Sequence, residues 1–104
     1  MEIQQAVGQG SLAANTTAAN NTAIGREALN DNTTGAGNTA VGRGALAANT
    51  TAANNTAVGL SALVANTTGT SNVAVGKDAL VTSIDGDGST AIGFEAFKTL
   101  EPAD

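Results

Sequence analysis

The segment Asp85-Gly86-Asp87-Gly88 has the spacing with which alternating carboxylates open a calcium-binding loop. A complete loop continues with a third oxygen ligand and ends on a glutamate, whereas the twelfth position here is Ala96. The segment also stands where earlier parts of the sequence carry an Asn-Thr-Thr turn. We therefore consider two interpretations, a calcium site at Asp85 and Asp87 and a polar turn, and we favour the turn.

Three of the four basic residues, Arg26, Arg43 and Lys77, directly follow a glycine at the same place in a repeated motif. Such a stripe of cations could attract anionic glycans or other surface polymers. Acidic residues stand beside two of them, at Glu27 and Asp78. A solvated corner of mixed charge is therefore the better interpretation of this stripe.

Four asparagines begin Asn-Thr-Thr sequences that match the acceptor pattern for N-glycosylation: Asn15, Asn32, Asn49 and Asn66. They recur every seventeen residues. If each seventeen-residue unit forms one coil of a stack, as argued below, sugars on successive coils would be only ~5 Å apart and therefore crowded. A ladder, in which identical side chains hydrogen-bond along a stack of coils, explains these asparagines better.

Catalytic chemistry has few candidate groups in this sequence. It contains no His and no Cys, and no pair of carboxylates recurs in a frame that would make an acid–base site. The formal charge of −5, with only four basic residues, argues against a surface that follows nucleic-acid phosphates. No apolar run approaches the ~20 residues of a membrane-spanning helix. We expect no enzyme, no cofactor, no nucleic-acid partner and no membrane insertion.

A repeat of seventeen residues organises all these groups. We number it from the residue four before each recurring glycine, so that Asn38 is position 1 and Gly42 is position 5. Position 3 is always Ala, position 4 is always Val or Ile, and position 9 is Leu in every copy except the last. The glycines at position 5 are Gly8, Gly25, Gly42, Gly59, Gly76 and Gly93.

This repeat predicts an all-β fold, a parallel β-solenoid of six 17-residue coils. On a continuous helix the Val/Ile and Leu ranks would spiral, because seventeen residues at about 100° each do not complete whole turns. We expect one solenoid domain over residues 4–97, with repeats that begin near residues 4, 21, 38, 55, 72 and 89. Residues 98–104 are expected to be a C-terminal cap or a truncated tail.

Within each coil, positions 1 to 4 predict a short strand, and the glycine predicts a corner with positive φ. The Ala-Leu pair at positions 8 and 9 is expected to begin a second strand or a straight segment, and Asn-Thr-Thr is expected to turn the chain onto the next coil. Stacking then predicts one ladder of the four asparagines named above and a second of threonines: Thr17, Thr34, Thr51 and Thr68.

Both faces of the expected strand are apolar, because side chains at positions 3 and 4 point to opposite sides. One face can fill the coil interior and the other requires a partner, most simply two further copies of the chain in a homotrimer. The sequence leaves open which face points inward. The residues assigned to the core or the interface are Ala23, Ile24, Ala40, Val41, Leu46, Ala57, Val58, Leu63, Ala74, Val75 and Leu80.

The segment from Asn54 to Leu63, NNTAVGLSAL, resembles the head repeat of YadA-type trimeric autotransporter adhesins, approximately N-S-V-A-I-G-x-x-[AS]. The arrays are also similar to those in tail-fibre proteins of bacteriophages. The resemblance covers about residues 4 to 97, although the adhesin repeats are shorter than the seventeen residues found here. It implies a left-handed β-roll assembled as a homotrimer in an attachment fibre, on a virion or a cell surface. A host-surface receptor or glycan would then be a further partner.

An ice-binding, or antifreeze, β-solenoid is the alternative function. Flat ranks of Thr on stacked coils can match an ice lattice, and the sequence is rich in Thr, Ala and Asn with few charges. The usual arrangement is Thr-x-Thr, which places both hydroxyls on one face of a strand. The threonines at positions 13 and 14 are adjacent and would face opposite ways in a regular strand, so we favour the attachment fibre.

Overall fold

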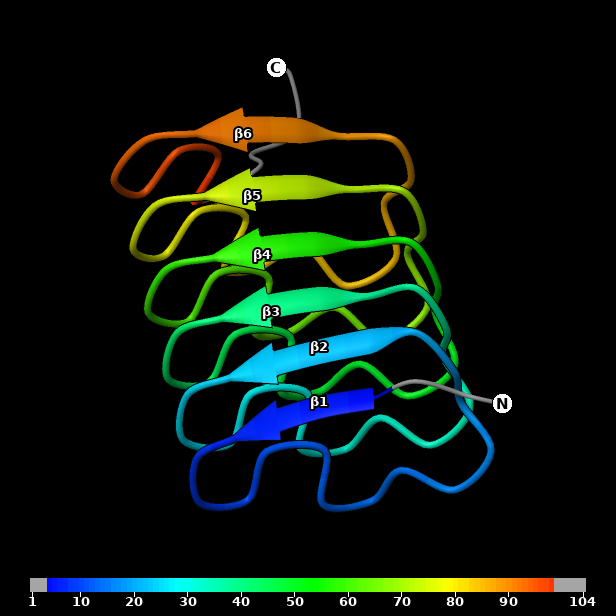
Figure 1. Cartoon of the computed structure of the whole chain (residues 1–104). Coiled ribbons are helices and arrows are strands. Elements are labelled where there is room, and N and C mark those ends of the chain that lie inside the picture. Colours follow the sequence, from blue (N-terminus) through cyan, green and yellow to red (C-terminus); the bar gives the residue numbers. More distant parts are fainter. Residues whose placement is uncertain (1–3, 99–104) are drawn as a thin grey trace.

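The computed structural model describes residues 4–98, and residues 1–3 and 99–104 lie outside the described part. Six strands form one parallel sheet in the order in which they occur along the chain (Figure 1). They are β1 (Gln4–Val7), β2 (Asn21–Ile24), β3 (Thr39–Val41), β4 (Thr56–Val58), β5 (Val73–Val75) and β6 (Thr90–Ile92). The chain makes one coil between each strand and the next, so the predicted all-β parallel solenoid is confirmed. The cap expected for residues 98–104 falls outside the described residues, except for Lys98.

The register of the sheet follows the sequence repeat without a slip. Ala40 pairs with Ala57, and Val41 pairs with Val58, each seventeen residues apart. The same offset relates every other pair of neighbouring strands. Since the coil and the repeat have the same length, residues at the same position stack directly on one another.

The interior of the solenoid is filled by small side chains from three positions of each coil. Position 3 supplies Ala from the strand, and positions 8 and 9 supply Ala and Leu from the opposite wall. The alanine face of the strand is therefore the inner face, and the Val/Ile side chains at position 4 point outward. The members of this hydrophobic core in the four central coils are Ala23, Ala28, Leu29, Ala40, Ala45, Leu46, Ala57, Ala62, Leu63, Ala74, Ala79 and Leu80.

The expectation of a second strand or straight segment at positions 8 and 9 is wrong. In the third coil the chain instead makes three successive tight turns, in which the N–H groups of Ala45, Ala47 and Asn49 donate to carbonyls three residues earlier. Leu46 is the third residue of the second turn and has a left-handed φ of 52°. A left-handed residue costs roughly 1–2 kcal/mol, whereas burying a Leu side chain contributes about 1.5–3 kcal/mol. The turn is favourable because it directs the leucine into the core.

Two ranks of buried asparagines run along the stack at positions 1 and 12. At position 12, Asn49 Nδ2 donates to Asn32 Oδ1 at 2.9 Å, and Asn66 Nδ2 donates to Asn49 Oδ1 at 3.1 Å. At position 1, Asn38 Oδ1 accepts the backbone N–H of Asn55 at 2.9 Å. The predicted asparagine ladder is thus confirmed, and the rank at position 1 adds a second.

The threonine ladder predicted at position 14 does not form. Thr17, Thr34, Thr51 and Thr68 are exposed, and the structure gives their hydroxyls no hydrogen bond along the stack. At position 13 the hydroxyls of Thr16, Thr33 and Thr67 instead donate to backbone carbonyls of the next coil, as Thr33 Oγ1 does to Thr50 O at 3.2 Å. At the bend after the asparagine the side chain of position 14 is exposed, whereas that of position 13 lies within hydrogen-bonding distance of the next coil.

Candidate functional site

The outward side of the six-stranded sheet is the surface most clearly set apart by its composition. We call it the outer face and define it as positions 2 and 4 of every coil. It contains no charged residue, and its exposed fractions reach 61% at Val7, 42% at Ile24 and 71% at Ile92. The members of the outer face are Gln5, Val7, Thr22, Ile24, Thr39, Val41, Thr56, Val58, Val73, Val75, Thr90 and Ile92.

Threonines at position 2 belong to this face, and the sequence interpretation did not assign them a role. Thr39 and Val41 flank the fully buried Ala40 and are both half-buried. The same pattern occurs at Thr56 and Val58. Period-two alternation was the signal that could have found them, because side chains two residues apart share one face of a strand.

The corner glycines hold the outer face in register. All six have a positive φ, between 122° at Gly8 and 134° at Gly59. A Cβ atom at Gly42 would lie 2.6 Å from Gly59 O, closer than side chains approach a backbone. A Cβ at Gly59 would likewise lie 2.6 Å from the carbonyl carbon of Gly76. Position 5 is therefore restricted by its backbone conformation in every coil, and in every coil except that of Gly93 also by the close contact of the next coil.

Charged side chains of the described residues all lie off the outer face. At the corner next to the glycine, Arg26 Nε lies 3.5 Å from Glu27 Oε1, and Lys77 lies over the ring of Phe94, 5.6 Å from its centroid. Together with Arg43, these side chains make an exposed corner of mixed charge, which the exposed apolar Leu60 and Phe94 interrupt. This placement agrees with the solvated corner that the sequence favoured.

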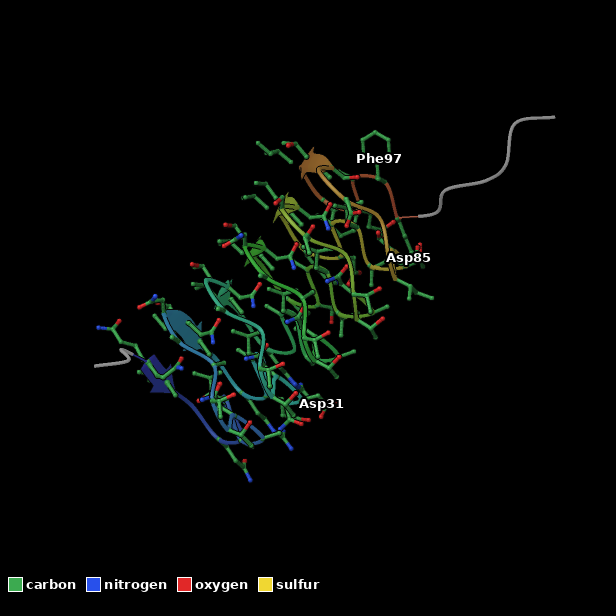
Figure 2. All side chains as sticks on the ribbon, turned by 90° about the vertical axis from the view of Figure 1, so that its right-hand side faces the viewer. Asp31, Asp85 and Phe97 are labelled. Carbon is green, nitrogen blue, oxygen red and sulfur yellow. The ribbon has the colours of Figure 1, made fainter. Side chains whose placement is uncertain are left out.

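The two aspartates of the calcium interpretation are exposed and lie at positions 14 and 16, off the outer face. Figure 2 shows the strands nearly end-on at one side, with Asp31 and Asp85 on the side that faces away from them. Asp87 Oδ1 instead accepts hydrogen bonds from Thr70, at 2.7 Å from the backbone nitrogen and 3.2 Å from the hydroxyl. Among residues 4–98, no group of three or more acidic, His or Cys side chains lies close enough to hold a metal ion.

The burial of these asparagine side chains favours a ladder over glycosylation. Asn32, Asn49 and Asn66 each have no exposed surface, and their amide groups are used within the stack. The described part of the chain also contains no helix long and apolar enough to cross a bilayer.

Comparisons with protein-family models, with curated proteins and with solved structures found no match to this chain. The likeness to adhesin and tail-fibre repeats therefore depends on the residues of the repeat alone.

Proposed function

We propose that this chain is a structural and attachment module, a homotrimeric segment of a phage tail fibre or of an adhesin-like surface protein. Its location would be a virion or a cell surface, and its coils would have the left-handed roll geometry of the repeats that they resemble. A host-surface receptor or glycan would be bound by the assembled fibre.

The observation that carries this proposal is the outer face, free of charge along the whole described stack. A solvated face of a sheet normally carries polar and charged side chains, whereas this one alternates Thr with Val or Ile in four of its strands and carries Gln5 and Val73 in place of Thr in the other two. Extended exposed apolar patches of this kind mark interaction surfaces. A second copy presents the same flat face with the same coil spacing, so three copies can bury their outer faces around one axis.

The test is the molar mass in native buffer, measured by light scattering for the wild type and two lysine variants. We expect wild type at three times the 10.0 kDa of one chain. Val58→Lys adds a charge at the centre of the outer face and should dissociate the trimer, because a buried unpaired charge is costly. Thr51→Lys adds the same charge at an exposed position off this face and should remain trimeric. A wild-type monomer of about 10 kDa with a full β circular-dichroism signal would contradict the proposal.

Ice binding remains a second candidate because of the same face. The adjacent threonines of positions 13 and 14 argued against it, but Thr at position 2 and Val or Ile at position 4 do share one side of the sheet. Their ranks repeat at the strand spacing of ~4.8 Å, which is the regular array that an ice surface requires. A monomer with thermal hysteresis that Val58→Lys abolishes would favour ice binding, and a trimer without hysteresis would favour the fibre.

A further inference from the structure

The asparagine ladder at position 12 ends in the fifth coil, where Ser83 takes the place of asparagine. Asn32, Asn49 and Asn66 of the ladder each donate two hydrogen bonds through Nδ2. Asn49 Nδ2 donates to Asn32 Oδ1 at 2.9 Å and to the carbonyl of Ala52 at 3.0 Å. Ser83 has a single hydroxyl, and Asn66 Oδ1, at the end of the ladder, is left buried without a partner among the described residues.

The backbone of the fifth coil nevertheless keeps the frame that surrounds an asparagine in the other coils. The N–H of Ser83 donates to Leu80 O at 3.1 Å, as the N–H of Asn66 does to Leu63 O at 3.1 Å. On the opposite side of the frame, Asn72 Nδ2 donates to Gly86 O at 2.6 Å, and Asn55 makes the equivalent bond in the fourth coil. The coil has therefore not contracted around the smaller side chain.

The hydroxyl of Ser83 is directed into this frame. The residue is 8% exposed, and a Cβ atom at Gly86 would lie 3.3 Å from Ser83 Oγ. The volume by which an asparagine side chain exceeds that of serine is about that of one water molecule, whose share of liquid volume is about 30 Å³. The frame is polar on three sides, at Asn66 Oδ1, Ser83 Oγ and Gly86 O.

We propose that one buried water molecule replaces the missing amide of the fifth coil. Its two O–H groups donate to Asn66 Oδ1 and Gly86 O, the two kinds of acceptor that an asparagine amide serves in the other coils. The hydroxyl of Ser83 donates to the water oxygen. Three hydrogen bonds are the usual number for a buried water, and they give the orphaned carbonyl oxygen its donor.

Two substitutions at Ser83 distinguish a site that holds a water from one that is an empty cavity. Ser83→Asn supplies both N–H groups and releases the water, so it should raise the thermal midpoint by up to about 4–8 °C, because the entropy cost of holding the water is removed. Ser83→Val fills the same space without a donor. If water occupies the site, valine expels it, leaves Asn66 Oδ1 unpaired and lowers the midpoint. If the gap is dry, valine fills a cavity and raises the midpoint, which would overturn the proposal.

High-resolution crystal structures of the wild type and Ser83→Asn give a second, independent measurement. In the wild type we expect a water within hydrogen-bonding distance of Asn66 Oδ1 and Ser83 Oγ. In the variant we expect the new amide at that place. A wild-type map without this water, at a resolution that orders other buried waters, would also overturn the proposal.

Discussion

The corner glycines are the residues at which adding a side chain is expected to lower the stability most. Gly59→Val places a β-branched residue at a φ of 134° and its Cβ within 2.6 Å of Gly76 O. The conformation alone costs at least the ~1–2 kcal/mol of a left-handed residue, and the contact requires the two coils to separate. We expect the thermal midpoint to fall well below that of the wild type. Arg43→Ala, at the exposed corner, should change the free energy of unfolding by no more than ~0.5 kcal/mol. A Gly59→Val variant that melts with the wild type would refute this account of position 5.

The asparagines of the ladder are expected to have the next largest effect on stability when they are replaced. Asn49→Ala removes the donor to Asn32 Oδ1 and the acceptor for Asn66 Nδ2, both of which are buried. Each polar group left unsatisfied costs about 1–3 kcal/mol, so the loss should exceed that of a typical surface substitution. Thr51→Ala, at an exposed position of the same coil, is the matched control and should lie within ~0.5 kcal/mol of the wild type. Equal urea midpoints for the two variants would show that the ladder contributes no stability.

At the scale of the element, the interchangeable unit is the coil. Deletion of residues 38–54 removes seventeen residues and joins Gly37 to Asn55, so that position 17 still precedes position 1. We expect this variant to fold with a reduced midpoint, because solenoid stability is approximately a sum over repeats and their interfaces. Deletion of residues 38–55 removes one residue more and moves the Thr and Val side chains of β4 to the wrong faces. Circular dichroism should show the β-signal retained in the first variant and lost in the second.

The strand, the corner and the coil stacking could be predicted because each depends on a residue type that recurs at a fixed position. Period-two alternation placed Ala40 and Val41 on opposite faces, but only the structure shows that alanine is inside. The turns at positions 7 to 9 could not be predicted in this way. A leucine such as Leu46 has no local preference for a φ of 52°, and it adopts this conformation because the stacked coils bury its side chain. The prediction of the outer face was incomplete for a related reason. Thr39 and Thr56 can be assigned to this face only after the structure shows that the alanine between Thr and Val points inward.

At the scale of the whole molecule, the outer face makes stability a property of the assembly. If three chains bury this face against one another, unfolding releases three chains, and mass action makes the thermal midpoint rise with protein concentration. We expect this rise for the wild type and for Thr51→Lys over a hundredfold range of concentration. Val58→Lys should melt at a lower temperature that does not depend on concentration, because its coils lose the contacts between chains. A wild-type midpoint independent of concentration would mean that the small core of Ala and Leu, with its two asparagine ranks, is sufficient for one chain to fold by itself.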